Sequence, residues 1–259
     1  MSVIETQLDT AESIAEQRNL RDRVREKWAK IIAFVSIIAI ALGGLNDTTD
    51  ALEKVYNFTL SQFTDIPSYE KLDRIYIRAS EGVLEETFGA PVYIKKTVSG
   101  DVVRYYSDKR FILSAVTNDG AISAFLVFPK KGFMPNTAEH AGGSLLLDRT
   151  LSNIESVDDI RVNYSRSISY YIEMNPAGDF SNLYSSVAGY SEFTAPLDDT
   201  KRNMLSDLSE GLMLGDDITE QVVKLRDSTA PNFYGYSAQG LEVLENAILT
   251  LTEYRLINK

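Results

Sequence analysis

The feature that most constrains this chain is an apolar stretch near its N-terminus, Trp28–Leu45 (WAKIIAFVSIIAIALGGL), which has no charged residue from Ile31 onward. As a helix, its eighteen residues rise about 27 Å, close to the hydrocarbon thickness of a thin bilayer. The stretch is therefore predicted to be a transmembrane anchor. The predicted anchor residues are Trp28, Ile31, Phe34, Ile38 and Leu42.

Three other interpretations of this stretch compete with a signal-anchor. Ala39-Ile40-Ala41 has the small-x-small pattern of a signal-peptidase site, although the charged lead before the stretch is long for a signal peptide. A run of this length is also compatible with a helix buried in a soluble core. The third alternative is an anchor of the opposite orientation.

The charges on either side of the stretch are unevenly distributed, and this predicts the orientation. Residues 1–30 carry six acidic residues and six basic ones, so the net charge of −11 is carried by residues 31–259. The bases are Arg18, Arg21, Arg23, Arg25, Lys27 and Lys30. Positive flanks are retained in the cytoplasm, so we expect a cytoplasmic N-terminus at the inner (cytoplasmic) membrane and a periplasmic or extracellular C-terminal domain.

The composition argues against several chemistries. An acidic chain lacks the basic surface that nucleic-acid phosphates require, so no nucleic-acid partner is expected. The absence of cysteine removes disulfides, thiolate metal sites and cysteine nucleophiles, and a single histidine argues against histidine-rich zinc sites. No nucleotide-binding glycine motif occurs. Neither a metal nor a cofactor is predicted.

The pattern after the apolar stretch predicts an α+β fold. Residues 69–88 have a helical composition and end at Phe88-Gly89-Ala90-Pro91, where glycine and proline stop a helix. A four-stranded antiparallel meander then covers residues 92–128, and Asn118-Asp119-Gly120 is a strong hairpin signal within it. Three helices are expected near the C-terminus, over residues 198–208, 217–227 and 237–257.

These expectations divide the chain into five segments. They are a charged helical cytoplasmic tail (1–27), the anchor (28–45), a helical stalk (46–66), a helix with the meander (67–131) and a mixed segment ending in helices (132–259). The last two are expected to form one domain. The N-terminal helices are candidates for self-association.

The order of these elements resembles the small envelope module of the SmpA/OmlA lipoprotein type. The resemblance covers about residues 70–130 and is carried by Leu84–Pro91, Val103-Arg104-Tyr105-Tyr106 and Asn118–Ile122. It implies a non-enzymatic helix-plus-hairpin domain that supports assembly at a membrane. The overall layout is also similar to that of bacterial single-pass membrane proteins.

Two patterns invite a catalytic or metal-binding interpretation. His140 lies near Ser144, but Gly142-Gly143-Ser144 is not the G-x-S-x-G motif of serine hydrolases, so an exposed loop histidine is favoured. The Asp-Asp pairs at 158–159, 198–199 and 216–217 each stand where a helix is expected to begin, which favours helix capping over a metal site.

Aromatic residues supply the candidate binding surface. Tyrosines beside Asp and Asn suit sugar stacking and protein interfaces, although tyrosine is also an ordinary strand residue. The candidate residues are Tyr164, Tyr170, Tyr171, Tyr184, Tyr190, Phe233, Tyr234 and Tyr236.

The first functional hypothesis is a non-enzymatic, membrane-anchored protein whose acidic domain mediates protein–protein interaction or scaffolding. The second is a ligand-binding or sensing domain, which a concave pocket lined by Tyr170, Tyr171, Tyr184 and Tyr190 would favour over a flat aromatic patch. A carboxylate-based hydrolase would need two acids facing one cleft. A membrane effector that acts by oligomerising is the fourth.

Overall fold

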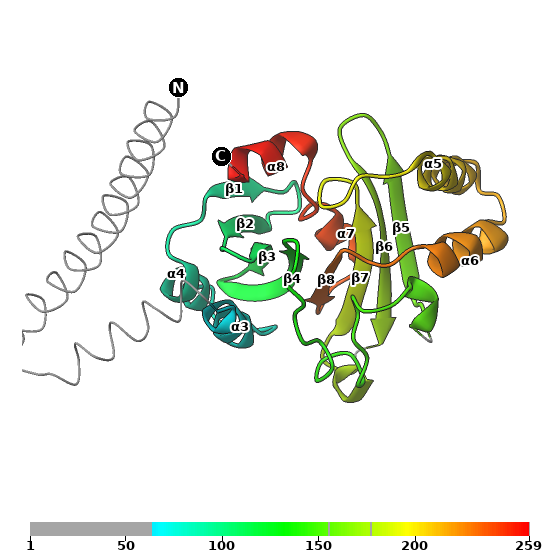
Figure 1. Cartoon of the computed structure of the whole chain (residues 1–259). Helices are drawn as coiled ribbons and strands as arrows, with labels where there is room; N and C mark the ends of the chain where they lie inside the picture. Colours follow the sequence, from blue (N-terminus) through cyan, green and yellow to red (C-terminus); the bar gives the residue numbers. More distant parts are fainter. Residues whose placement is uncertain (1–63, 155, 177, 259) are drawn as a thin grey trace, which may run out of the picture. The chain divides into compact units, whose positions relative to one another are not determined.

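The computed structural model describes residues 64–154, 156–176 and 178–258, which form an eight-stranded antiparallel sheet with helices on both faces (Figure 1). The strand order is β1-β2-β3-β4-β8-β7-β6-β5, and every neighbouring pair is antiparallel. The sheet thus consists of two meanders that meet where β4 pairs with β8.

The first meander forms from neighbouring segments of the chain. Its strands are β1 (Tyr93–Lys96), β2 (Val102–Ser107), β3 (Phe111–Asn118) and β4 (Ala121–Pro129). Asp119 and Gly120 connect β3 to β4 with φ values of 49° and 79°, the left-handed conformation of a two-residue hairpin turn. The hairpin predicted at Asn118-Asp119-Gly120 is confirmed.

The second meander closes only after a long excursion of the chain. Its strands are β5 (Asp159–Tyr164), β6 (Ser169–Pro176), β7 (Ser185–Ser191) and β8 (Phe233–Ser237). Two helices separate β7 from β8 in sequence. Tyr234 of β8 lies opposite both Val127 of β4 and Ala188 of β7, so β8 joins the two halves of the sheet.

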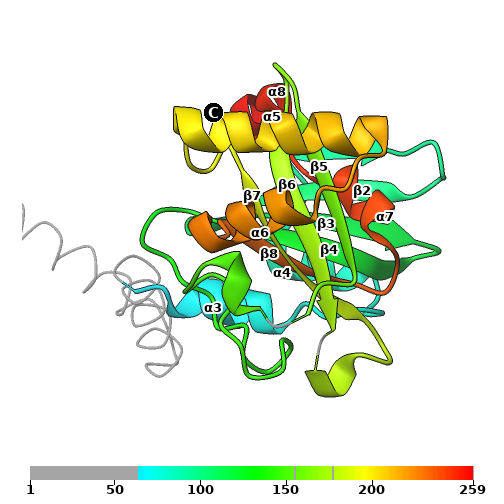
Figure 2. The same ribbon diagram turned by 90° about the vertical axis from the view of Figure 1, so that its right-hand side faces the viewer.

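Helices cover each face of the sheet, and each face has its own hydrophobic cluster. One cluster includes residues of α3 (Ile66–Asp73), α4 (Gly82–Phe88), α5 (Asp199–Leu214) and α6 (Thr219–Ser228). The other includes α7 (Leu241–Glu245) and α8 (Leu251–Ile257). Figure 2 shows α5 and α6 crossing in front of the second meander. Short 3-10 turns occur at η1 (Leu151–Asn153) and η2 (Gly178–Phe180).

The predicted fold class is wrong in the extent of its sheet. The four strands at residues 92–128 do not form a four-stranded sheet of their own, because β8 continues the same sheet beyond β4 into the second meander. The long-range pairing of Phe125 with Tyr236 has no local signal, so sequence periodicity could not reveal it.

The helix predicted over residues 237–257 is also wrong. That region contains the last residue of β8 and the two short helices α7 and α8. Thr250 starts α8 with a capping box, in which the Thr250 hydroxyl accepts a hydrogen bond from the Glu253 backbone N–H and the Glu253 carboxylate accepts one from the Thr250 backbone N–H. The cap starts a new helix at this point, although the spacing of apolar residues over 237–257 is that of one continuous helix.

The helix predicted over residues 69–88 is divided into α3 and α4. Between them, Arg78 has a positive φ of 72°, and the backbone N–H of Arg78 donates to the carbonyl of Ile122. The interhelical segment therefore pairs with the start of β4 instead of continuing the helix. The predicted stop at Phe88 is confirmed, since Gly89 follows with a φ of 76°.

The predicted transmembrane anchor must be corrected as well. Across the part of the chain that the structure describes, none of the helices is long and apolar enough to cross a membrane. The described residues therefore do not support the prediction of a single-pass, signal-anchored membrane protein. The segment Trp28–Leu45, with Trp28, Ile31, Phe34, Ile38 and Leu42, lies outside the described residues, as do the tail and most of the stalk.

Candidate ligand-binding pocket

A cavity of about 350 Å³ opens on the face of the sheet that carries α3 to α6, and we call it the His140 pocket. Its floor and apolar wall consist of Leu72, Ile75, Phe125, Tyr234 and Tyr236. Its rim consists of Asp73, Tyr76, Asn136, Glu139 and His140. The volume lies in the range of small-molecule sites, roughly 300 to 1,000 Å³.

The floor of the pocket is built where the two meanders meet. Tyr236 of β8 lies opposite Phe125 of β4, and their rings contact edge to face with centroids 5.4 Å apart. Tyr234 projects to the same face because side chains two residues apart in a strand share a face. The floor therefore exists only when β8 is paired with β4.

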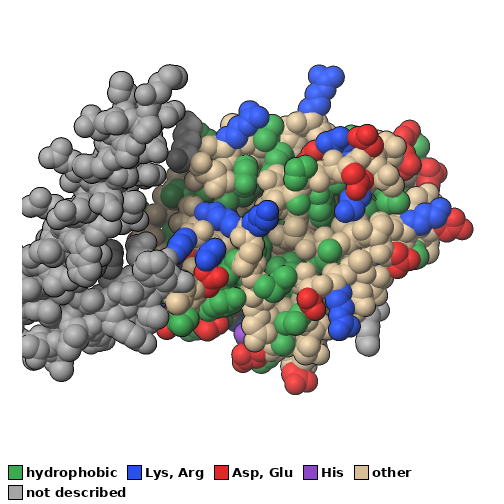
Figure 3. All heavy atoms as spheres, viewed as in Figure 1, with side chains coloured by type: hydrophobic (Ala, Val, Ile, Leu, Met, Phe, Trp, Pro, Cys, Tyr) green, Lys and Arg blue, Asp and Glu red, His purple; other side chains and the backbone are tan. Residues whose placement is uncertain are grey.

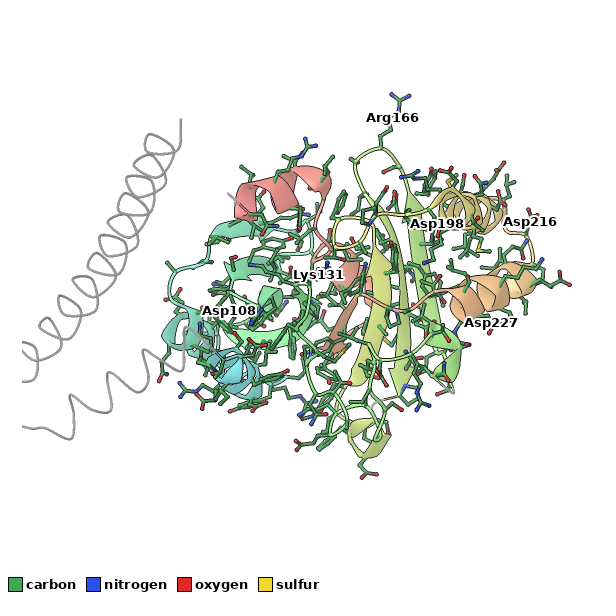
Figure 4. All side chains as sticks on the ribbon, in the orientation of Figure 1. Asp108, Lys131, Arg166, Asp198, Asp216 and Asp227 are labelled. Carbon is green, nitrogen blue, oxygen red and sulfur yellow. The ribbon has the colours of Figure 1, made fainter. Side chains whose placement is uncertain are left out.

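Helix α3 places Asp73 and the apolar wall beside this floor. Asp108, which follows β2 and is labelled in Figure 4, accepts hydrogen bonds from Ser68 Oγ at 2.5 Å and from Lys71 Nζ at 2.7 Å. Burial acts to raise the pKa of Asp108, but hydrogen bonds from Lys71, Ser68 and the Arg110 backbone together lower it below the ordinary value. The ionised Asp108 thus fixes α3 to the first meander.

The loop after β4 supplies the rest of the rim. Buried Thr137 braces this loop, since its Oγ1 donates to the carbonyl of Ser144 and accepts from the backbone N–H of Leu146. Gly142 then lies against Gly178, where a Cβ added to Gly178 would come within 2.5 Å of the Gly142 Cα. Both glycines have positive φ, so this close approach requires glycine on each side.

His140 is held against an aromatic cluster. Its Nδ1 lies 2.5 Å from the hydroxyl of Tyr184, and its ring centroid lies 5.3 Å from that of Phe180 and 5.4 Å from that of Tyr236. Burial, with a contribution from Glu139, raises the pKa of Tyr184 above its ordinary value. The Tyr184 hydroxyl therefore keeps its proton and can form a hydrogen bond with the imidazole.

The hydroxyls of the two floor tyrosines have no partner within the described part of the chain. Tyr234 and Tyr236 are only 4% and 6% exposed, yet among the described residues neither hydroxyl forms a hydrogen bond. Burial raises the pKa of Tyr234 well above its ordinary value and also raises that of Tyr236, with smaller contributions from Asp73 and Glu139 respectively. Both hydroxyls are therefore neutral groups that can donate and accept, and both line the cavity.

The two carboxylates at the rim also lack partners. Neither Asp73 nor Glu139 forms an ion pair or side-chain hydrogen bond within residues 64–154, 156–176 and 178–258. They do not share a metal position with His140, because the described residues contain no group of three His, Cys, Asp or Glu side chains that could hold a metal ion. The pocket thus carries two acidic residues without a counter-ion in the described part of the chain.

Two larger hollows each contain a charged residue that is paired within the protein. A hollow of about 520 Å³ between the hairpin loops includes Asp101, which accepts from Ser99 at 2.6 Å and from Asn118 at 2.6 Å. One of about 420 Å³ between β5 and α5 includes Arg161, which pairs with Asp159 at 2.8 Å. The His140 pocket differs from both in combining two carboxylates with two tyrosine hydroxyls, all unpaired among the described residues.

A closed cluster on the same face of the sheet provides a contrast, and we call it the Glu173 cluster (Tyr171, Glu173 and Arg226). Glu173 is fully buried and pairs with Arg226 Nε at 3.0 Å. The Tyr171 hydroxyl donates to Glu173 at 2.9 Å, and Arg226 also donates to the carbonyls of Leu151 and Ile154. Its charged groups are thus paired with one another, which fastens α6 and η1 to β6.

The candidate residues predicted from the sequence have different environments. Tyr170, Tyr171, Tyr190 and Phe233 are buried, at 3%, 0%, 5% and 0% exposure, while Tyr164 is 38% exposed at the end of the edge strand β5. Tyr170 donates to Glu245 and Tyr190 to the Ala195 carbonyl. The structure brings together Tyr184, Tyr234 and Tyr236, around His140.

Sequence reasoning missed the polar rim of the pocket. Asp73, Asn136 and Glu139 come from α3 and from the loop after β4, far in sequence from Tyr234 and Tyr236. His140 was noted only as the single histidine in a loop. Its position just before Gly142-Gly143 is the one local signal, and that signal indicates a tight turn but not a pocket.

The arrangement does not resemble either catalytic constellation considered from the sequence. The His140 Nδ1 is engaged by Tyr184, while Ser144 contributes its carbonyl to Thr137. Asp73 and Glu139 do share one cavity, but both are exposed residues. A carboxylic acid that donates a proton in glycoside hydrolysis needs an apolar environment to hold that proton near neutral pH.

The three Asp-Asp pairs serve different local roles. Asp198 caps α5, since its Oδ1 accepts from the Lys201 backbone N–H at 2.8 Å, as predicted. Asp217 accepts from the backbone and the hydroxyl of Thr219, but the N-cap position of α6 is Ile218, without a side-chain cap. Asp159 begins the strand β5 instead of a helix.

Comparisons with known proteins yield no family. No family model matches the chain, and no curated protein matches it. Two solved structures are similar at TM-scores of 0.36: a cysteine-rich secretory protein of Staphylococcus aureus, at 10% identity, and an extracellular protein containing an SCP domain from Bacillus anthracis, at 9% identity. The matches cover 69% and 72% of this chain, which spans about half of those proteins, 50% and 53%. Likeness at this level assigns neither a family nor an activity.

Proposed function

We propose that the domain is a non-enzymatic ligand-binding domain and that the His140 pocket holds the ligand. The single observation that carries this proposal is a pair of largely buried tyrosines, Tyr234 and Tyr236, that line a cavity and whose hydroxyls have no hydrogen-bond partner among the described residues. A hydroxyl that opens into a cavity and has no partner in the described chain can both donate to and accept from a bound ligand. In the Glu173 cluster, by contrast, the Tyr171 hydroxyl and the Glu173 carboxylate are paired within the protein.

A scaffolding role remains a prediction, as does self-association through the N-terminal helices. On the face shown in Figure 3, hydrophobic side chains are interspersed with charged and other polar ones instead of forming one broad apolar area. This favours a concave ligand site over a flat aromatic docking surface on that face.

The single histidine makes the proposal directly testable. The imidazole proton signals of His140 in the full-length chain can be followed by NMR while three probes are added: methyl α-glucoside, n-butylammonium and acetate. We expect at least one probe to shift these signals saturably, and Tyr236→Phe to weaken its binding. If all three leave the signals unchanged at millimolar concentration, the proposal is wrong.

We also propose that the domain meets its ligand outside the cytoplasm. Six bases cluster between Arg18 and Lys30, and the net negative charge lies on residues 31–259. This distribution supports a cytoplasmic N-terminus and a C-terminal domain outside the cytoplasm. A reporter enzyme that is active only outside the cytoplasm, fused after Lys259, should be active. A silent fusion that is produced at normal levels would contradict the proposal.

A further inference from the structure

We infer that the ligand of the His140 pocket is a protonated amine on an aliphatic stem, as in a lysine side chain. This inference rests on the proposed ligand-binding function and deepens it. Two features of the pocket support this inference. The rim carries carboxylates without counter-ions among the described residues, and hydrogen-bond acceptors lie next to an apolar wall.

The charges at the pocket favour a cation. Asp73 and Glu139 contribute two carboxylates, and no Lys or Arg is among the lining residues. Within the described part of the chain neither carboxylate has a counter-ion. In contrast, Asp108, which lies beside the same helix, is paired with Lys71 at 2.7 Å. A cationic ligand would supply the missing counter-charge, and the chain's net charge of −11 would attract it over longer distances.

The polar atoms of the pocket favour an ammonium group in particular. An ammonium has three N–H donors and no acceptor. The pocket offers two carboxylates and the oxygen atoms of two neutral tyrosine hydroxyls, which can all accept. A bare metal ion is less suitable, because among the described residues no three ligating side chains converge. The acceptors are spread around a cavity of about 350 Å³, which suits a larger organic cation.

The remaining surfaces of the pocket favour an aliphatic stem next to the charge. Leu72, Ile75 and Phe125 provide apolar contact below the rim. Tyr76, at the rim, is 58% exposed, so its ring is accessible to a ligand. A cation over such a ring is attracted by its π electrons.

The test compares a lysine probe with its uncharged counterpart. Nα-acetyl-lysine methylamide and Nα-acetyl-norleucine methylamide are titrated into the full-length chain, and the His140 imidazole signals report occupancy. We expect the lysine probe to bind about tenfold more tightly or better, as two weak carboxylate contacts and one cation–π contact would give. Binding of the lysine probe should also weaken as the salt concentration rises, while that of the norleucine probe should not.

Charge-removing variants complete the test. Asp73→Asn combined with Glu139→Gln should remove most of the preference for lysine over norleucine. Glu210→Gln, which removes an exposed carboxylate from α5 outside the pocket, should leave the preference unchanged.

The outcomes separate the inference from the proposed function. Equal binding of the two probes, or binding of methyl α-glucoside alone, would overturn the amine inference while leaving a ligand-binding pocket in place. If neither peptide probe, nor the sugar, nor acetate shifts the His140 signals, both the inference and the proposed function are wrong. A tenfold lysine preference that the Asp73/Glu139 variant retains would place the amine elsewhere and overturn the inference.

Discussion

The Glu173 cluster and the His140 pocket lie on the same face of one sheet and are built from the same residue types, tyrosine and carboxylate. In the Glu173 cluster the buried carboxylate has a guanidinium at 3.0 Å and a tyrosine hydroxyl at 2.9 Å. In the His140 pocket two carboxylates and two tyrosine hydroxyls have no partner among the described residues. The comparison indicates that pairing, and not composition, separates a site that stabilises the fold from one that can bind.

The largest expected effect of a substitution is in the Glu173 cluster. Arg226→Met should lower the free energy of unfolding by about 3 to 5 kcal/mol, because it leaves the buried Glu173 carboxylate without a counter-ion. Urea denaturation of the full-length chain measures the change. Adding Glu173→Gln should restore part of the loss, and Arg149→Met, at an exposed arginine, serves as the control. A fully stable Arg226→Met variant would contradict the structural role of the cluster.

The next effect concerns Asp108, whose ion pair holds the helix that carries Asp73. Its folded pKa lies below the unfolded value of 3.8, so its stabilising contribution is present above that pH and is lost as the pH falls through the folded pKa. Asp108→Asn should therefore cost about 1 to 2 kcal/mol at pH 7 and much less near pH 2. Denaturation at the two pH values measures this; a pH-independent loss would show that the ion pair is not its source.

A matched pair of tyrosine substitutions sharpens the comparison. Tyr171→Phe should cost about 1 kcal/mol, because it removes a hydrogen bond to a buried carboxylate. Tyr236→Phe should change stability by less than about 0.5 kcal/mol, because its hydroxyl bonds to no described residue, although it should weaken probe binding. Equal losses of stability would mean that the Tyr236 hydroxyl is already satisfied in the folded chain.

The smallest expected effect on stability is at the rim. Asp73→Asn should leave the free energy of unfolding unchanged or slightly higher, since it relieves repulsion in an acidic chain and breaks no ion pair among the described residues. Thermal unfolding without a ligand is a sufficient measurement. A clear loss of stability would indicate that Asp73 has a structural partner.

Local signals predicted the first half of the fold well and the pocket poorly. The turn at Asn118-Asp119-Gly120 and the stop at Gly89 depend on backbone conformations that particular residues favour, so they are visible in sequence. The pairing of Phe125 with Tyr236 depends on closure of a loop of more than a hundred residues, for which no short pattern exists.

The residues of the pocket likewise could be predicted only where a local pattern marks them. Tyr234 and Tyr236 attracted notice because they form an aromatic group, but Asp73 and Glu139 are ordinary surface acids until the fold brings them to one cavity. The two fully buried residues Tyr171 and Glu173 show the converse, since their mutual hydrogen bond follows from a shared strand face.

The position of β8 has a consequence for how the protein must be made. Until residues 233–237 emerge from the ribosome, the facing edges of β4 and β7 have no strand between them. Open strand edges are templates for pairing with other chains, so the nascent chain passes through a long stage in which it is exposed to aggregation. Because β8 also carries Tyr234 and Tyr236, the pocket forms only when this strand pairs with its neighbours. Binding of a ligand would therefore indicate that the sheet is complete.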